Sequence, residues 1–442
     1  MQKILPQLRA IAGICGKQGV APGRCHLSQY CLRVAVEGGE LLYHNMTGEL
    51  LLLSAEEAAG MFGRAGVRDE LVARWFLVPE GFDEYRHARQ TRDVALLIAP
   101  QESQTAHFVV FPTTDCNARC FYCYELGRPR RNMSDAVAHD VAAFIVRRTA
   151  GRDVRINWFG GEPLYNARAI DVITGDLAVD GVSLTSQMTT NGYLFDEELV
   201  RHARDGWALD DVQITLDGTE SVYNRSKAFV GVEGSAYRRV LRNIGLLSDA
   251  GVDVSLRLNL NGSNERDLWQ LADELAERFG GRENVTAYTV LLRDFGFGSM
   301  PHESRHRALA AYGALQGHLH DVGIGRPWLP RRSVKVNQCM ADNDNWITIL
   351  PDGRLGKCEH ESEDKLVGRI YDDGLDEEAV RAWKRVVRVP ECEGCLFFPS
   401  CIRLRECAWH AEGCTEYDRE EMRINLRHRV LTAYEQYCRE HR

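Results

Sequence analysis

The sequence predicts an α/β protein with a partial, TIM-like (β/α)6 barrel, a winged-helix-like unit before it and a cysteine-rich unit after it. Three observations predict this order. Short β-prone runs separated by turn signals come first, β-prone runs then alternate with amphipathic segments from about 105 to 300, and eight of fourteen cysteines follow from residue 339 onward. We therefore expect domains at 1–100, 101–330 and 331–442.

Composition narrows the class of protein further. The 442 residues are 44% hydrophobic and 26% charged, which is typical of a folded protein with a large core. The net charge of −9 argues against nucleic acid as the main partner. No apolar run reaches membrane-spanning length and no signal peptide is evident, so we expect a cytoplasmic protein without membrane contact. Cytoplasmic thiols stay reduced, so fourteen cysteines indicate metal binding or catalysis rather than disulfides.

The first hundred residues predict hairpins and short helices. Three β-prone runs are Leu32–Val36, Leu41–Asn45 and Leu50–Leu53. Ser54 and Glu57 form a capping-box pattern that opens a helix, and residues 71–76 predict another. Eleven basic and eleven acidic residues balance in this unit, so it lacks the basic face of a DNA reader and more plausibly holds a protein or peptide.

The middle of the chain predicts a parallel sheet. Six strands are expected at His107–Pro112, Val154–Phe159, Leu184–Thr189, Asp211–Leu216, Val252–Leu260 and Val285–Leu292. Helices at 235–250 and 266–279 show apolar stripes. Sites on such sheets form at the carboxyl ends of the strands. Residues 300–335 are polar and predict a connector, and a helix from about 417 to 440 closes the chain.

Three cysteines follow the first barrel strand at C-x3-C-x2-C spacing: Cys116, Cys120 and Cys123. Thiolates are the usual ligands of iron–sulfur clusters, which commonly take four, so three thiols leave one iron open to another ligand. Buried structural cysteines and a zinc site completed from elsewhere are the alternatives.

This spacing, with the aromatic Tyr122 before the last cysteine, resembles the radical S-adenosylmethionine (SAM) enzymes over residues 106 to 300. The resemblance implies a [4Fe-4S] cluster whose free iron binds SAM, and reductive cleavage of SAM to a 5′-deoxyadenosyl radical that abstracts hydrogen. The protein would orient the substrate and exclude water.

Further strand-end motifs match the same family. Gly160, Gly161, Glu162 and Pro163 resemble its glycine-glycine-glutamate-proline loop, whose backbone meets the amino group of SAM, although alone they could be a tight turn. Softer matches, which the resemblance places near the ribose or methionyl carboxylate, are Asn191, Thr215, Asp217, Arg257 and Asn259. The alternative is that these residues only form ordinary turns at the strand ends and do not contact SAM.

The tail resembles the SPASM domain, which carries two auxiliary [4Fe-4S] clusters in radical SAM enzymes that mature peptides and proteins. A zinc ribbon is the alternative, but the tail has one C-x2-C pair and more cysteines than one zinc site uses. The resemblance implies a first cluster on Cys339, Cys358 and Cys407, and a second on Cys392, Cys395, Cys401 and Cys414. The chain departs from the pattern after Cys401, where five residues precede the next cysteine instead of three. Cys438 is expected to be structural.

Three protein ligands on the first auxiliary cluster would leave an iron for a substrate thiolate. Asp342, Asp344 and Glu359 lie near these cysteines, where surface solvation is the expected role, and no general acid or base is assigned. The front unit resembles the precursor-peptide recognition element, which binds a leader by strand addition, with a structural cap as the alternative. Its Cys15, Cys25 and Cys31 lack cluster spacing and are expected to be small buried residues.

Together these features predict a peptide maturase that binds a ribosomal precursor by its leader and forms a crosslink. A thioether from a cysteine sulfur to a carbon is the preferred product. A carbon–carbon crosslink is second, and oxidation of a residue in a sulfatase-like protein is third. A flavodoxin or ferredoxin would donate electrons. Rivals of other classes are an iron–sulfur electron carrier, which does not need the Gly160 loop, and a zinc-stabilised peptide adaptor.

Overall fold

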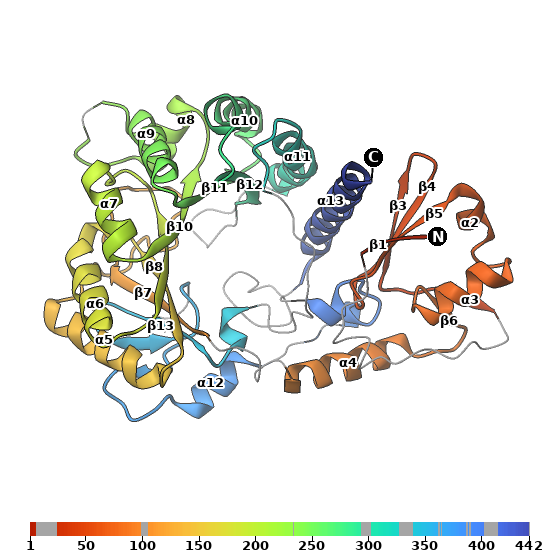
Figure 1. Cartoon of the computed structure of the whole chain (residues 1–442), viewed down its shortest axis with the longest axis horizontal. Coiled ribbons are helices and arrows are strands. Elements are labelled where there is room, and N and C mark those ends of the chain that lie inside the picture. The colour runs from red at the N-terminus through yellow and green to blue at the C-terminus, as the bar shows by residue number, and fades with distance from the viewer. Residues whose placement is uncertain are drawn as a thin grey trace.

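The fold was analysed in a computed structural model of the whole chain (Figure 1). The structure describes residues 1–5, 24–98, 105–232, 234–292, 302–326, 339–360, 363, 365–385, 388, 390–401 and 414–441. The predicted α/β class and the mostly parallel central sheet are confirmed.

All six predicted barrel strands are present and pair in chain order. They are β7 (Thr105–Thr113), β8 (Asp153–Gly160), β9 (Leu184–Thr190), β10 (Leu209–Leu216), β11 (Asp253–Leu260) and β12 (Val285–Leu291). Neighbouring strands run parallel. In β10 the buried Val212 and Ile214 alternate with half-buried polar residues, so the apolar set faces the helices and the polar set faces the barrel interior.

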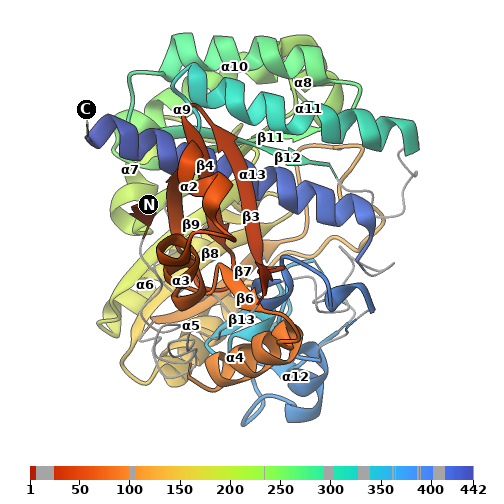
Figure 2. The same cartoon turned by 90° about the vertical axis from the view of Figure 1, so that its right-hand side faces the viewer.

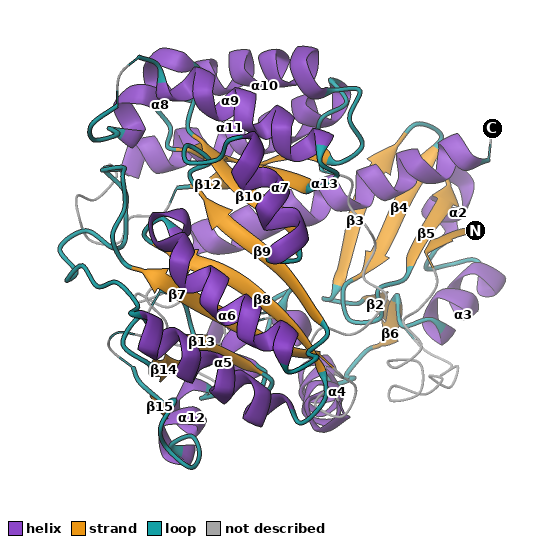
Figure 3. Cartoon of the chain, turned by 60° about the vertical axis from the view of Figure 1, so that its left-hand side comes forward, coloured by secondary structure: helices purple, strands orange, loops and turns teal. Residues whose placement is uncertain are grey.

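Helices cover the outer face of this sheet (Figure 3). They are α5 (Asp135–Thr149), α6 (Ala167–Val179), α7 (Glu197–Gly206), α8 (Glu220–Lys227), α9 (Ala236–Asp249) and α10 (Glu265–Phe279). One apolar cluster joins the two layers, with Trp158, Ile214 and Leu256 from the strands against Ile170, Ile244 and Leu271 from the helices. This rigid core leaves the strand ends and the loops that follow them for the site.

The prediction of a polar connector after residue 300 is wrong for its first part. Residues His302–Asp321 form a 20-residue helix, α11, whose Ala308, Tyr312, Leu315 and Leu319 join the barrel core. The charged and histidine-rich spacing hides an apolar face at helical period. The expected helix at 71–76 is also displaced: α3 (Ala65–Ala73) begins six residues earlier and ends at Ala73, within the predicted range.

The central sheet continues into the cysteine-rich region, which the sequence analysis did not predict. β13 (Trp346–Ile349) pairs in parallel with β7, and β14 (Arg354–Gly356) and β15 (Gly368–Arg369) extend the same sheet. The expected boundary at residue 330 lies outside the described residues, and the sheet crosses it. Two further helices of this region are α12 (Glu377–Trp383) and α13 (Glu416–Glu440).

The N-terminal unit is a four-stranded antiparallel sheet in the order β1-β5-β4-β3. Its strands are β1 (Gln2–Leu5), β3 (Cys31–Val36), β4 (Gly39–His44) and β5 (Leu50–Ser54), and β2 (Cys25–Leu27) pairs separately with β6 (Leu77–Pro79). The predicted capping box on Ser54 and Glu57 opens α2 (Ala55–Gly60). The helix α4 (Glu84–Ile98) then leads towards the barrel.

Both faces of this sheet are covered, and the second cover comes from the far end of the chain. Leu42, Leu51 and Leu53 pack with residues of α2 and α3. On the other face, Val34, Leu41, Tyr43 and Leu50 pack with Leu426, Val430 and Ala433 of α13. Figures 1 and 2 show α13 beside the sheet, and it also contacts α11, where the Tyr312 hydroxyl donates to Asn425 Oδ1 at 2.8 Å.

Candidate functional site

A pocket of about 860 Å³ opens at the carboxyl ends of the barrel strands. The three cysteines of the predicted cluster motif line it together with Gly160 and Gly161. Five more of its lining residues belong to the predicted SAM set or its neighbours on the strand ends: Tyr122, Asn191, Thr215, Arg257 and Asn259. Residues from five different strand ends or loops therefore meet around one space.

The cysteine loop is held by short polar contacts. The backbone N–H of Cys116 donates to Asp115 Oδ1 at 2.8 Å, and the N–H of Ala118 approaches Cys116 Sγ at 3.3 Å. Arg119 donates to the carbonyl oxygens of Cys116 and Ala118 at 2.6 and 2.7 Å. These local hydrogen bonds hold the loop in a tight turn, and the thiols lie half-buried at the pocket wall.

The thiol chemistry of this loop fits an iron–sulfur cluster. Burial raises the pKa of Cys116 to about 12 and that of Cys123 to about 11, so the free thiols are protonated at neutral pH. A positively charged metal group would displace those protons. Among the described residues, no three His, Cys, Asp or Glu side chains converge as ligands of a single metal ion. A four-iron cube takes its thiolates on separate irons, so three thiols along one wall suit it.

The two glycines of the second loop are required by backbone contact. A Cβ on Gly160, whose φ is +116°, would lie 2.2 Å from the Thr113 carbonyl oxygen, and one on Gly161 would lie 2.2 Å from that of Asp115. The N–H groups of Gly161 and Glu162 donate to those same two oxygens at 3.1 and 2.9 Å. The glycine loop is thus fastened directly to the residues that precede Cys116.

Glu162 and Pro163 lie behind the pocket and do not line it. Glu162 is fully buried, and its carboxylate accepts hydrogen bonds from Thr190 Oγ1 at 2.7 Å and from the backbone N–H of Asn191 at 2.8 Å. Burial raises the pKa of Glu162 to about 7 despite these donors. Its side chain joins the β8 and β9 strand ends, while the loop backbone faces the pocket.

Asp217 likewise lies beneath the pocket, where it anchors Tyr122. The Tyr122 hydroxyl donates to the Asp217 carboxylate at 2.8 Å, and Lys227 Nζ lies 2.8 Å from that hydroxyl and 3.2 Å from Asp217. Asp217 and Lys227 are each 4% exposed. Burial disfavours the charged amine, but the Asp217 carboxylate outweighs this and raises the pKa of Lys227. Sequence analysis missed Lys227, because a lysine near the end of a helix carries no local signal of a buried partner 10 residues earlier.

The cysteine-rich region supplies a second wall. Glu359 and His360, which follow Cys358, line the same pocket as the barrel residues. Glu359 has a side chain that is 24% exposed, and its Oε2 is buried without a hydrogen-bond partner. The expectation that Glu359 and Asp342 are solvated is wrong, since Asp342 is 7% exposed, whereas Asp344 is a surface residue.

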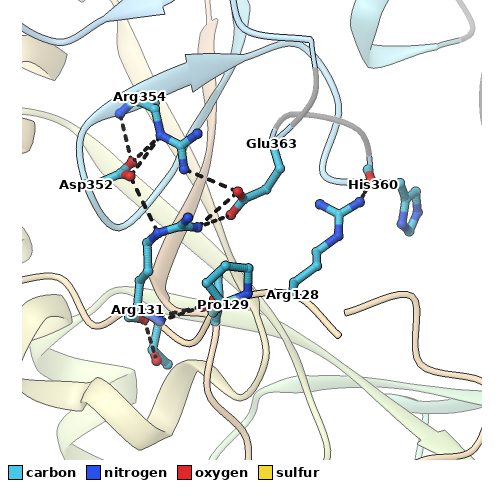
Figure 4. Close-up of polar contacts among 9 residues, drawn as sticks. Arg128, Pro129, Arg131, Asp352, Arg354, His360 and Glu363 are labelled. Atoms are coloured by element: carbon cyan, nitrogen blue, oxygen red, sulfur yellow. Dashed lines mark hydrogen bonds and ion pairs between the residues drawn. The ribbon is translucent and has the colours of Figure 1, made fainter. Parts of the chain in front are cut away.

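A network of charges fixes this second wall to the cysteine loop (Figure 4). Arg131, eight residues after Cys123, pairs with Glu363 at 2.7 Å, and Arg354 pairs with Glu363 at 3.2 Å and with Asp352 at 2.8 Å. Arg128 donates to the carbonyl oxygen of His360 at 2.9 Å. The main chain of Arg131 is bonded to Thr114, two residues before Cys116, so the loop and the wall are mechanically joined.

The remaining predicted cluster ligands occupy two places. Cys358 is buried and Cys339 half-buried at the edge of the barrel core. Cys392, Cys395 and Cys401 gather in one apolar cluster with Tyr30, Met46 and Ala88 of the N-terminal unit. Cys414 lies two residues before the start of α13, beside Arg419. Cys407 and Cys15 lie outside the described residues, and Cys25, Cys31 and Cys438 are half-buried.

Comparison with known proteins agrees with this geometry. A family model described as the radical SAM superfamily matches residues 110–275. The chain is 31% identical over 312 residues to a GTP 3′,8-cyclase of Rhodopirellula baltica, covering 64% of this chain and 80% of that protein. The chain belongs to the radical SAM superfamily. Members of this superfamily are enzymes, and membership implies a [4Fe-4S] cluster that binds SAM.

Other relatives match the chain over different lengths. A serine-type anaerobic sulfatase-maturating enzyme of Klebsiella aerogenes is 27% identical over 320 residues, 65% of this chain and 75% of that protein. A probable GTP 3′,8-cyclase of Pyrobaculum aerophilum is 33% identical over 172 residues, 38% of this chain and only 52% of that protein. The solved structure of native anSMEcpe with bound AdoMet superposes with a TM-score of 0.58 at 14% identity, covering 75% of this chain and 99% of that one. This likeness establishes the shared fold.

No helix in the described part of this radical SAM chain is both long and apolar enough to span a bilayer.

Proposed function

We propose that this chain matures a ribosomal precursor peptide by radical SAM chemistry and forms an intramolecular crosslink, first a cysteine thioether. The observation that carries the proposal is the meeting of the Cys116, Cys120 and Cys123 thiols with the Gly160–Gly161 backbone at one pocket. When bound there, the cluster and SAM would supply a 5′-deoxyadenosyl radical able to take hydrogen from an unactivated carbon.

The chain's own residues would bind and orient. The backbone of Gly160 and Gly161 faces the pocket without side chains and can approach an amino group closely. Asn191, Thr215 and Asn259 offer hydrogen bonds suited to ribose hydroxyls, and Arg257 offers a cation suited to a carboxylate. Glu162, Pro163 and Asp217 would act beneath this layer by holding it in place, and Asp217 would do so by fixing Tyr122 at the pocket wall.

The N-terminal sheet would hold the leader of the precursor. β3 forms one edge of the sheet, so its outer N–H and C=O groups can pair with an added strand. The Klebsiella relative, named for maturing a sulfatase, supports a protein or peptide substrate. The same fold holds AdoMet together with a peptide in anSMEcpe, at a TM-score of 0.57 and 15% identity. We assign residues 1–100 to leader recognition, 101–330 to the barrel and 331–442 to the auxiliary clusters.

The auxiliary clusters are part of the proposal. Cys339, Cys358 and Cys407 would hold one, with an open iron for the substrate thiolate, and Cys392, Cys395, Cys401 and Cys414 would hold the other. Glu359 has a buried carboxylate oxygen at the pocket wall and is placed to accept a proton there. A flavodoxin or ferredoxin would reduce the enzyme in the cytoplasm.

Anaerobic reconstitution tests the proposal. The wild-type chain, the triple variant C116A/C120A/C123A and the control Cys438→Ala are loaded with iron and sulfide, then given SAM and a reductant. We expect the triple variant to hold about four fewer irons per chain and to form no 5′-deoxyadenosine. The control variant should match the wild type. Intact SAM after reduction of the fully loaded wild type would overturn the proposal.

A second candidate function, oxidation of a serine or cysteine in a protein, is favoured by the 27% identity to the sulfatase-maturating enzyme. A thioether product and an oxidised serine are each two hydrogens lighter than the substrate, so mass alone does not separate those two, whereas oxidation of a cysteine to an aldehyde also exchanges sulfur for oxygen through hydrolysis with release of hydrogen sulfide. Small cysteine-containing peptides encoded beside the chain distinguish the two by reactivity. A thioether product has lost a thiol and has no carbonyl that reacts with a hydrazide, whereas an oxidised residue gains an aldehyde.

A further inference from the structure

The pocket carries more positive than negative charge. Seven of its lining residues are arginine or lysine and four are aspartate or glutamate. Most of these cations are already engaged: Lys227 binds Asp217, Arg130 binds Asp115, Arg155 binds Asp210, and Arg119 and Arg128 donate to carbonyl oxygens. In the described part of the chain, Arg257 and Arg326 line the pocket without an ion pair to a carboxylate.

Tyr288 lies near both of these arginines. Arg257 in β11 is the register partner of Tyr288 in β12. The backbone N–H of Arg326 donates to Ala287 at 2.9 Å, which sets its guanidinium carbon 5.7 Å from the centre of the Tyr288 ring. The Tyr288 hydroxyl is fixed by donation to Gln213 Oε1 at 2.6 Å. Ordered polar groups on three neighbouring segments therefore hold the two cations beside one aromatic ring.

One pocket carboxylate lies near this group. Burial raises the pKa of Asp211, and the nearby charges of Arg326 and Arg155 oppose this rise, although Asp211 forms no ion pair with either arginine in the described structure. Arg155 is also held by Asp210 at 3.2 Å. Arg155 is thus paired with Asp210, whereas Arg326 forms no ion pair in the described structure, and its charge is left for a ligand.

We propose that Arg326 binds a carboxylate of the substrate, so that the peptide segment in the pocket carries an aspartate or glutamate. This inference rests on the proposed function and names the substrate class of that site. A guanidinium presents paired N–H groups that match a carboxylate, and exclusion of water around the bound group strengthens the contact. The pocket that Arg326 lines is continuous with the cysteine loop, so one ligand can reach both.

Peptide binding to the reconstituted full-length chain tests the proposal. The probes are a fluorescein-labelled Ala-Gly-Cys-Asp-Gly-Ala peptide and its twin with asparagine in place of aspartate, measured by anisotropy in the presence of SAM. The wild type should bind the aspartate peptide at least about tenfold more tightly. Arg326→Gln should bring the ratio close to one, and Arg326→Lys should retain part of it. Arg168→Gln, which removes an exposed arginine of α6 outside the pocket, should leave the ratio unchanged.

Two further arms separate the possible failures. Equal affinity for the two peptides, or binding of neither, overturns the carboxylate site. Tighter competition by GTP than by the aspartate peptide overturns it in favour of a nucleotide, since phosphate oxygens also suit guanidinium groups. Formation of 5′-deoxyadenosine from SAM is followed in parallel without peptide. If SAM is cleaved while the peptides bind equally, only this inference fails, and if SAM stays intact the proposed function fails.

Discussion

Arg131 Nη1 lies 2.7 and 2.9 Å from the two carboxylate oxygens of Glu363, and this contact joins the exit of the cysteine loop to the segment that follows Cys358. Two regions separated by 232 residues thereby form one pocket wall (Figure 4). Arg354 shares the same carboxylate, so each charge of the network has a partner.

Removing the Glu363 charge should destabilise this wall. Glu363→Gln leaves Arg131 and Arg354 facing each other at a site where Glu363 is 13% exposed. We expect the free energy of unfolding to fall by about 1 to 3 kcal/mol, as for hydrogen bonds to partly buried charges. Anaerobic urea unfolding measures it. The matched control is Asp135→Asn, which removes an ion pair with both side chains exposed and should change the value by less than about 0.5 kcal/mol. If the two variants lower the free energy of unfolding equally, the Glu363 ion pairs do not stabilise the pocket wall.

Gly160 should not tolerate a methyl group. Gly160→Ala places a Cβ 2.2 Å from a backbone oxygen at a φ of +116°, so the loop must move away from Thr113. We expect a loss of ~2 kcal/mol or more in stability together with loss of SAM cleavage. Gly175→Ala in α6 meets no atom within 4 Å and should be neutral or slightly stabilising. Wild-type stability in Gly160→Ala would show that the contact with Thr113 is not needed.

The buried ion pair of Lys227 and Asp217 should show energetic coupling between its two members. Lys227→Met leaves the Asp217 carboxylate, 4% exposed, without its cation, which should cost about 3 to 5 kcal/mol. Asp217→Asn added to Lys227→Met removes the uncompensated charge, so the double variant should be more stable than Lys227→Met alone. A double-mutant cycle by chemical unfolding measures the coupling. Strict additivity of the two effects would mean that the residues do not interact.

Acid should weaken the N-terminal sheet through His44. This side chain is 1% exposed, and burial lowers its pKa to about 3 from an ordinary value of 6.5. Below pH 6.5 His44 is protonated in the unfolded chain but stays neutral in the folded chain. The contribution of His44 to the free energy of unfolding is therefore fully present above pH 6.5 and is lost as the pH falls towards 3. One such group contributes a slope of about 1.4 kcal/mol per pH unit.

The pH dependence is measured by urea unfolding at pH 7, 6 and 5. His44→Gln is the control, because it keeps a polar side chain beside Ser28, which lies 3.2 Å from His44 Nε2, but does not titrate. The variant should show a shallower loss of stability between pH 6 and 5. The same slope in both proteins would assign the acid sensitivity to other groups.

Local patterns made most of the barrel predictable. Each strand carries its own alternation, and Cys116, Cys120 and Cys123 are so close in sequence that one loop must hold them together. The apolar face of α11 was missed because charged residues and histidines mask its period. β13 was missed because a short run such as Trp346–Ile349 becomes a strand only when β7 offers an edge.

The site was predictable only where a motif is continuous. Gly160 and Gly161 were identified from the sequence motif around them. The need for glycine at these positions comes from tertiary contacts with the Thr113 and Asp115 backbone, which the sequence does not show. Glu359 was assigned to solvent because nothing in its local sequence shows that the network around Glu363 holds that segment against the barrel. Long-range burial of single charged groups is the part of a site that sequence periodicity does not encode.

Because α13 packs on the N-terminal sheet, the sheet can be fully covered only late in the synthesis of these units. Val34, Leu41, Tyr43 and Leu50 precede the barrel in the chain, whereas their cover, Leu426, Val430 and Ala433, follows it. Until α13 has been synthesised, this sheet presents an uncovered apolar face that chaperones or other nascent chains can bind. The leader-recognition unit of the proposed function thus becomes competent only after the catalytic barrel has already been made.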